Sequence, residues 1–223
     1  MSSNYLDSFK VSVPEGRSGP WAVERFTIDP DDPAMQLENL RLSFQPGGAR
    51  RQLLPGGYTR LVHDKRGVVM SDTPAEIKEH WDILIRLATH SSPGKNTRFP
   101  VPQSLLINGL GLGVVLKAAV DNPLVQSIDV VEIDEYVLRL VAPHYNSPKV
   151  TFHHDDAYTI QWPKRKRWNA VWNDIWDDIC LDNLSLMAKL HRRYARRCDW
   201  YGSWSHAELK DIQQRERRAG WIY

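Results

Sequence analysis

The stretch that decides the fold is S-L-L-I-N-G-L-G-L-G at residues 104–113, which runs directly into the apolar segment V-V-L-K-A-A-V at 114–120. Its first part is a short apolar run of the kind that forms a buried strand, and three glycines at every second position come after it. Glycine adopts positive φ without strain and lets the backbone approach a ligand closely. The stretch therefore predicts a buried parallel strand, a sharp turn at Gly109, Gly111 and Gly113, and a helix whose first N–H groups face a ligand.

The spacing of the glycines narrows the kind of ligand. The dinucleotide fingerprint is Gly-x-Gly-x-x-Gly, but the sixth position counted from Gly109 is Val114. The Gly-x-Gly-x-Gly of this chain is instead the form typical of adenosylmethionine-dependent methyltransferase folds. Three glycines in a loop are often no more than a loop, so the interpretation depends on the residues downstream of them.

The composition limits the size and the class of protein that the chain can form. A chain of 223 residues holds one ordinary domain and a small addition, and 42% hydrophobic with 25% charged residues is typical of a soluble globular protein. The formal charge of +2 does not indicate a bulk polyanion binder, and nine Trp residues favour a cleft or an interaction surface. Cys180 and Cys198 are interpreted as buried thiols of a reducing compartment. With no signal-like N-terminus and no membrane-length apolar window, we expect a cytoplasmic protein without a membrane partner.

Residues 1–57 are rich in Pro, Gly, Asp and Arg. This composition predicts an irregular N-terminal extension that contains a few short strands, such as Trp21–Ile28 and Leu40–Phe44. The extension could cover a cleft as a lid, pair with another subunit or remain mobile, and the sequence leaves open whether the chain forms a homo-oligomer.

Residues 58–100 are expected to lead into the core. Two β-prone runs separated by D-K-R predict a hairpin over 58–70. A helix then begins after Thr73, which can form a capping box with Glu76, and is expected to end near His90.

Residues 101–223 alternate between strand and helix patterns, which predicts a parallel, doubly wound, Rossmann-like α/β sheet. Little chain remains after the last helix, so the sheet should be truncated at about five strands. After the first strand at Ser104, the expected strands are Ser127–Ile133, Val150–His153, Trp168–Trp172 and Trp200–Trp204, and the expected helices are Val114–Val120, Glu135–Ala142, Leu181–Arg197 and Ala207–Ala219.

Carboxylates fall at the ends of three predicted strands. Glu132 closes the second strand, Asp156 with Ala157 comes after the third, and Asp174 ends the fourth. Ligands of doubly wound sheets bind at these carboxyl ends. A single such carboxylate is more often an exposed loop residue, but several in the right order predict one site.

With these residues in place, the chain resembles a known family. The run L-L-I-N-G-L-G-L-G, then D-V-V-E-I-D-E, then V-T-F-H-H-D-D-A-Y, then W-N-A-V-W-N-D-I-W-D is similar to the spermidine-synthase-like branch of class I adenosylmethionine-dependent methyltransferases. Like that branch, the chain has Ile107 two residues before the first glycine. The resemblance covers about residues 58–205.

The resemblance implies a cofactor and a set of site residues. The cofactor would be S-adenosylmethionine, with Glu132 on the ribose, Asp156 on the adenine, and Asp174 beside a small-molecule acceptor. The residues expected to bind the cofactor are Asn108, Gly109, Gly111, Gly113, Glu132, Ile133, Asp156 and Ala157. Asp174 and Asp177 are the expected catalytic residues, and Trp176 and Tyr158 the expected acceptor pocket, with Trp172 either beside them or in the core.

Three departures from the family concern polyamine chemistry. Aminopropyltransferases have Asp where this chain has Leu112, Gln where it has Met70, and Pro where it has Asp178. Methyl transfer to an unidentified acceptor is therefore the favoured function. The alternatives are an aminopropyltransferase that uses the decarboxylated donor, and a catalytically inactive scaffold of the same fold.

Two further patterns have plainer explanations. His153, His154, Asp155 and Asp156 could suggest a metal site, but adjacent strand residues point to opposite faces, so no metal is expected. The basic runs P-K-R-K-R at 163–167 and H-R-R-Y-A-R-R at 191–197 could contact nucleic acid, although solvated faces carry such runs routinely.

Overall fold

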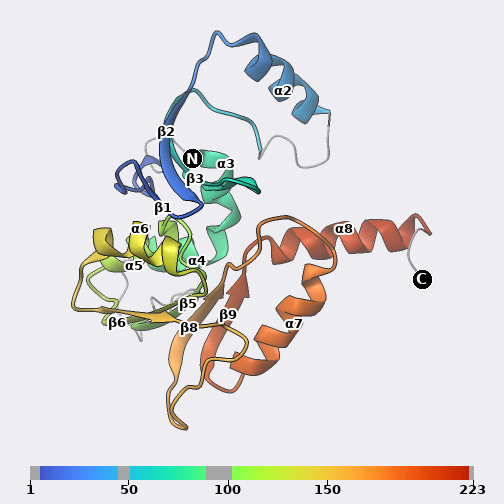
Figure 1. The fold of residues 1–223 in the computed structure, drawn as a ribbon. Coiled ribbons are helices and arrows are strands. Elements are labelled where there is room, and N and C mark those ends of the chain that lie inside the picture. The colour runs from blue at the N-terminus through green and yellow to red at the C-terminus, as the bar shows by residue number, and fades with distance from the viewer. Residues whose placement is uncertain (1–5, 45–50, 89–101, 221–223) are drawn as a thin grey trace.

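The computed structural model describes residues 6–44, 51–88 and 102–220 of the chain, and it contains two sheets (Figure 1). The larger sheet has five strands, all parallel, in the order β7-β6-β5-β8-β9. Its strands are β5 (Ser104–Asn108), β6 (Ser127–Glu132), β7 (Val150–His154), β8 (Trp168–Asn173) and β9 (Cys198–Ser203). Strand β5 is central because its apolar residues are buried on both faces, and the order reverses between β5 and β8.

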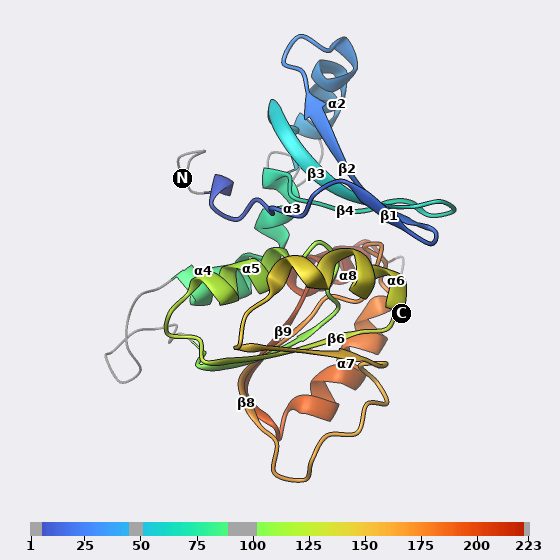
Figure 2. The same cartoon turned by 60° about the vertical axis from the view of Figure 1, so that its left-hand side comes forward.

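Helices cover both faces of this sheet (Figure 2). One face carries α4 (Trp81–Ala88), α5 (Val114–Asp121) and α6 (Glu135–Val141). The other face carries α7 (Asn183–Tyr194). Helix α6 continues directly into a 3-10 turn, η2 (Ala142–Tyr145). The final helix α8 (His206–Arg218) contacts α7. The predicted doubly wound, Rossmann-like α/β fold with five strands is confirmed.

The smaller sheet is antiparallel and comes from the N-terminal part of the chain. It contains β1 (Gly16–Ser18), β2 (Trp21–Ile28), β3 (Gly56–His63) and β4 (Gly67–Ser71), in that order. The predicted strand at 21–28, the hairpin over 58–70 and the small β-rich extension are confirmed. The sheet joins segments on both sides of the boundary expected at residue 57, because β2 pairs with β3 along its whole length. It contacts α6, so it lies next to the carboxyl end of the parallel sheet.

The strand predicted at Leu40–Phe44 is wrong. Most of this segment lies in the helix α2 (Pro33–Ser43). Asp32 caps the helix by accepting a hydrogen bond from the Ala34 N–H at 2.8 Å, and Pro33 takes the first position. The helix start therefore outweighs the short alternation of apolar and polar residues in L-R-L-S-F.

The single helix predicted from Thr73 is also corrected, because it is two helices. The short α3 (Pro74–Glu79) ends at His80, and α4 begins at Trp81. The predicted capping box does not form: Thr73 makes no capping bond with its side chain, and Glu76 instead accepts from the backbone N–H and the hydroxyl of Ser71 at 2.7 and 2.6 Å. The predicted end near His90 lies outside the described residues.

The break between α3 and α4 places His80 in the interior of the protein, with its ring edge to face against Trp172. Ile77, Ile83 and Leu84 are buried in the main core, and His80 is buried among them with 1% of its surface exposed.

Within the described segments, no helix is long and apolar enough to cross a membrane.

Candidate active site

A cavity of about 410 Å³ lies at the carboxyl ends of the parallel strands, beside the point where the strand order reverses. Its walls come from both sheets. The loops after β5, β6, β7 and β8 form one side, and residues of β2, β3, β4 and α3 form the other. The cavity is therefore assembled from parts of the chain that are far apart in sequence.

The loop after β5 needs glycine for two separate reasons. Gly109 has φ +95°, and a Cβ at this position would overlap the carbonyl oxygen of Asp174. Gly111 has φ +49°, and a Cβ there would overlap the Met70 sulfur. Both glycines line the cavity, whereas Gly113 starts α5 and lies against the ring of Tyr145 instead.

Glu132, at the end of β6, lines the cavity and orders the glycine loop. One carboxylate oxygen accepts from the Leu110 N–H at 2.8 Å and the other from the Asp134 N–H at 2.9 Å. Burial raises the pKa of Glu132 above its usual value, against the effect of these hydrogen bonds. The next residue, Ile133, lines the same cavity, and its side chain is 67% exposed.

The turn after β7 brings Asp156, Ala157 and Tyr158 to the cavity. The Asp156 carboxylate accepts from the Tyr158 N–H at 2.8 Å, which fixes the turn, and Ala157 is buried beneath it. The Tyr158 hydroxyl is buried without a hydrogen-bond partner among the described residues.

Asn108, like Gly113, is an expected cofactor residue that does not line the cavity. The Asn108 side chain is fully buried between strands, and its amide N–H donates to the side-chain oxygen Oδ1 of Asn173 at 2.8 Å. It joins β5 to β8 directly below the glycine loop. The two expected acceptor aromatics, Trp176 and Tyr158, both line the cavity, whereas Trp172 is buried in the core and stacks on Trp200 at 6.3 Å.

Asp174 and His80 face each other on the side of the cavity opposite Asp156. The Nδ1 of His80 lies 3.7 Å from Oδ2 of Asp174, and both residues line the cavity. Burial, together with the nearby Glu79, raises the pKa of Asp174 to about 8, and burial lowers the pKa of His80 to about 4. Because both groups are buried, the pair is favoured in its neutral form near pH 7.

Neither ring nitrogen of His80 has a hydrogen-bond partner among the described residues. An unsatisfied buried polar group costs about 1–3 kcal/mol. Glu76 lies at the same wall, and burial raises its pKa to about 8. This wall is therefore prepared for a polar ligand.

The N-terminal sheet covers the cavity through two contacts. The indole N–H of Trp21 donates to Asp134 at 2.7 Å, and the guanidinium of Arg66 lies 4.6 Å from the Trp21 ring. Arg66 also forms an ion pair with Asp177, across the mouth of the cavity. Asp177 is thus held by the cover, and Asp174 is the carboxylate that faces inward.

The residues that come from this cover and from α3 were not predicted from the sequence. Trp21 and Arg66 gave no local signal, because their partners are more than 100 positions away. His80 gave one: it is three residues after Ile77 and four before Leu84, so it lies on the apolar face of the predicted helix. A histidine on such a face is either satisfied in the core or part of a site, and here it is unsatisfied.

The two histidines of the rejected metal site bind different partners. His153 Nε2 lies 2.9 Å from Asp129, and His154 Nε2 lies 3.0 Å from the Ile133 carbonyl oxygen. Asp156 faces the cavity. These side chains are therefore directed to three different places.

We expect the stability of the protein to fall as the pH rises from about 6.5 to 8. Glu76 and Asp174 hold their protons up to about pH 8 in the folded state, whereas the unfolded chain releases them near pH 4, so the folded state binds more protons in this range. His80 acts in the opposite sense below pH 6.5, where the unfolded chain gains a proton that the buried imidazole does not. Between about pH 4.5 and 6.5 the two carboxyls outweigh the one imidazole, so the midpoint of thermal unfolding should fall across the whole range from about pH 5 to 8, by several degrees in all, at roughly 2–4 °C per kcal/mol.

Calorimetric unfolding across this pH range checks the expectation. The control is Glu76→Gln, which retains an acceptor for Ser71 but cannot titrate, and it should reduce the fall between pH 6.5 and 8. An unfolding midpoint that rises over the same pH range would contradict the conclusion that Glu76 and Asp174 are protonated in the folded state.

Comparisons with known proteins give matches to solved structures alone. No model of a protein family matches the sequence, and no curated protein matches it. The N-methyltransferase NodS from Bradyrhizobium japonicum WM9 is similar with a TM-score of 0.39 and 12% identity, over 54% of this chain and 61% of that one. An S-adenosylmethionine-dependent methyltransferase from Mesorhizobium loti has a TM-score of 0.36 and 12% identity, over 52% and 49%.

The plantazolicin methyltransferase BpumL, solved in complex with SAH, is similar with a TM-score of 0.35 and 15% identity, over 54% of this chain and 40% of its own. The matched part is thus less than two thirds of the length of each of these three proteins. The fold of this chain is established by its own strand order and helix positions.

Proposed function

We propose that the cavity binds S-adenosylmethionine and that the protein transfers its methyl group to an amine acceptor. The observation that carries this proposal is that Gly109, Glu132 and Asp156, which come after three different parallel strands, line one cavity at the switch point of the sheet.

The residues of this wall fit an adenosine. Each oxygen of Glu132 accepts one backbone N–H, and a carboxylate oxygen has a second acceptor site that a ribose hydroxyl can use. The exposed side chain of Ile133 offers an apolar surface for the purine ring. Gly109 and Gly111 present backbone without side chains, which leaves room beside the loop for the rest of the donor.

The charge of the cavity favours a positively charged ligand. The donor sulfonium and a protonated amine both meet this condition, and the Trp176 ring adds an aromatic surface that attracts cations. Arg66 is the single Lys or Arg among the described lining residues. The acidic residues of the lining that carry this charge are Glu132, Asp134, Asp155, Asp156 and Asp177. Glu76 and Asp174 also line the cavity, but burial raises the pKa of each to about 8 and favours their neutral forms near pH 7.

Bound S-adenosylmethionine would supply an electrophilic methyl group. The chain itself contributes position and proton transfer. The cover formed by Trp21 and Arg66 excludes water and aligns the acceptor with the donor, which lowers the entropic part of the barrier. Asp174, once ionised, accepts a proton from the acceptor amine, and the neutral His80 holds a polar group of the same ligand.

Within this proposal we place the chain in the spermidine-synthase-like branch, and aminopropyl transfer from the decarboxylated donor is the second candidate. The acidic lining favours the second candidate, because the decarboxylated donor and a diamine are both cations. Leu112 and Met70 oppose it, because these two buried residues stand where aminopropyltransferases have Asp and Gln, and they contact each other through a bond from the Leu112 N–H to the Met70 sulfur at 3.2 Å.

Calorimetric titration tests the donor site. The wild-type protein should bind S-adenosylmethionine and its demethylated product, and Glu132→Gln should weaken both about 10- to 100-fold, because a charged hydrogen bond is worth about 1.5–3 kcal/mol. The matched control is Glu135→Gln, which removes a carboxylate of α6 that pairs with Arg139 outside the cavity, and it should leave the affinity unchanged.

The same titration separates the candidates. Preference for the decarboxylated donor would favour aminopropyl transfer. If none of the three compounds binds, both enzyme functions are excluded and an inactive scaffold of this fold remains.

A further inference from the structure

A second cavity of about 550 Å³ lies on the α7 side of the parallel sheet, away from the first one. It is formed between the loop that comes after the β7 turn and the outer face of α7 and its C-terminal end. Its described lining contains four cationic side chains and no carboxylate. The lining residues are Gln161, Trp162, Lys189, Arg192, Arg193, Tyr194 and Arg197.

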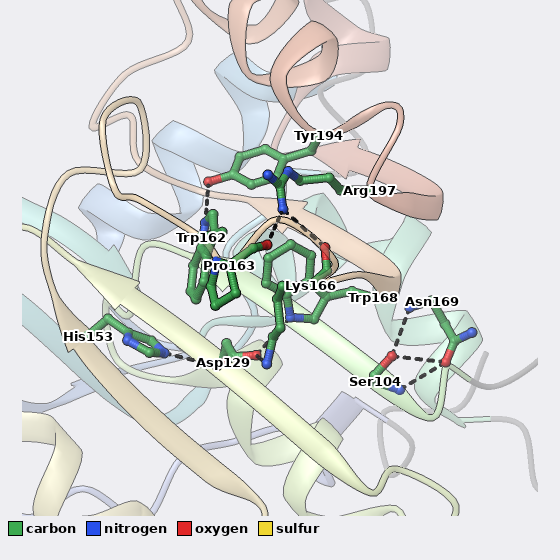
Figure 3. A network of polar contacts seen from close by, with 10 residues as sticks. All are labelled: Ser104, Asp129, His153, Trp162, Pro163, Lys166, Trp168, Asn169, Tyr194 and Arg197. Carbon is green, nitrogen blue, oxygen red and sulfur yellow. Dashed lines mark hydrogen bonds and ion pairs between the residues drawn. The ribbon is translucent and has the colours of Figure 1, made fainter.

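The loop wall of this cavity is held in place by side chains (Figure 3). Trp162 Nε1 donates to the Tyr194 hydroxyl at 3.3 Å, and that hydroxyl donates to the Ala157 carbonyl oxygen at 3.0 Å. Arg197 donates to the Pro163 carbonyl oxygen at 3.0 Å. These bonds join the loop to α7 at several points, so the hollow between them is a built part of the fold.

The buried end of the same loop is anchored under the sheet. Lys166 forms an ion pair with Asp129 at 2.6 Å, and Asp129 also accepts from the Trp168 indole N–H at 2.7 Å (Figure 3). The Trp162 and Trp168 rings meet edge to face at 4.9 Å. Asp129 thereby neutralises Lys166, and the remaining cations of the loop stay on the outside.

The charge of this surface is concentrated. Segments 163–167 and 189–197 contain nine of the 29 Lys and Arg residues of the chain and no Asp or Glu, although the whole chain has a net charge of +2. Lys189 and Arg192 are exposed at the cavity and have no ion-pair partner among the described residues. Exposed cations without ion-pair partners attract an anionic ligand.

We propose that this surface, which we define as segments 163–167 and 189–197 with the cavity between them, binds the phosphate backbone of a single-stranded nucleic acid. One phosphate would lie in the cavity against Lys189 and Arg192. Neighbouring phosphates would lie along Lys164, Arg165 and Arg196, which are exposed beyond the cavity. These cations are spread over a larger surface than a single phosphate group can contact, which favours a polymer. A flexible single strand can enter the recess, whereas a straight duplex cannot.

Fluorescence anisotropy with a labelled polyuridine of about 20 nucleotides tests the proposal. The double variant Lys189→Gln/Arg192→Gln should bind at least tenfold more weakly than the wild type at low salt. Loss of the one phosphate contact in the cavity should reduce the slope of log affinity against log salt by about 0.7.

The matched control is Arg41→Gln/Arg139→Gln, which removes the same charge from exposed sites on α2 and α6. It should change the affinity little. Three results would overturn the proposal: no binding of the oligonucleotide at about 50 mM salt, an equal loss in the control, or competition by AMP at the same molar concentration as the oligonucleotide. The last result would indicate a site for a small phosphorylated ligand.

This inference does not depend on the function of the first cavity. S-adenosylmethionine titration of the Lys189→Gln/Arg192→Gln variant should match the wild type, which also shows that the variant is folded. Failure of donor binding in both proteins, with oligonucleotide binding retained, would remove the proposed function and leave this one.

Discussion

Gly109→Ala is expected to abolish donor binding and to lower the thermal unfolding midpoint by about 10 °C or more. The added Cβ would overlap the Asp174 carbonyl oxygen, and that oxygen belongs to backbone held to β5, because the Asp174 N–H donates to the Asn108 carbonyl oxygen at 2.7 Å. The φ of +95° adds strain for any residue with a side chain. Large losses of about 4 kcal/mol or more arise from this kind of backbone conflict.

Gly57→Ala is the matched control. Gly57 lies in β3, its φ is not in the left-handed region, and a Cβ there would meet no described atom within 4 Å. Alanine at such a position is neutral or slightly stabilising. Thermal unfolding and donor titration of the two variants should therefore differ sharply. Wild-type donor affinity in Gly109→Ala would show that the loop after β5 does not form the donor site.

Asp174→Asn is expected to reduce transfer by about 100- to 1,000-fold while donor affinity stays within about twofold of the wild type. Removal of a positioned proton acceptor typically has an effect of this size. Asn preserves the shape of the side chain but cannot accept the proton of the amine. The measurement is the release of the demethylated product with putrescine and spermidine as acceptor probes, alongside calorimetric titration of the donor.

The pH profile distinguishes this role from a structural one. Because burial raises the pKa of Asp174 to about 8, the wild-type rate should rise with pH up to about 8 and then level off, and Asp174→Asn should lack this rise. Asp178→Asn, an exposed carboxylate of the same loop outside the described cavity lining, is the control and should keep both the rate and the profile. A full rate in Asp174→Asn would assign the proton to another group.

The parallel half of the fold can be predicted from local patterns. Continuous apolar runs such as 105–107 are compatible with burial on both faces, and the helices between them carry one apolar face each. The carboxylates Glu132 and Asp156 could be placed for the same reason, since a residue at the end of a parallel strand lies at the ligand edge wherever the strand is in the sheet.

The rest of the site depends on contacts that no local pattern contains. The break at His80 is set by the packing of α3 and α4 against the core, and the helical pattern of this segment continues through it. Asp177 was expected in catalysis from the resemblance to the family, but its place in the structure is decided by Arg66 in the hairpin. The α2 segment shows the reverse case, because the signal at Asp32 and Pro33 was present and a weaker strand pattern was preferred.

The two sides of the first cavity differ in the sequence separation of the residues that meet to form them. On the side proposed to bind the donor, the hydrogen bond from Leu110 to Glu132 joins residues 22 positions apart. On the side proposed to bind the acceptor, the contacts join residues 113, 111 and 125 positions apart: they are Trp21–Asp134, Arg66–Asp177 and Trp204–Glu79. Short loops close at lower entropic cost than long ones. During folding the side proposed to bind the donor is therefore expected to form first, and the side proposed to bind the acceptor last. A partly folded chain would then bind the nucleoside before its acceptor site exists.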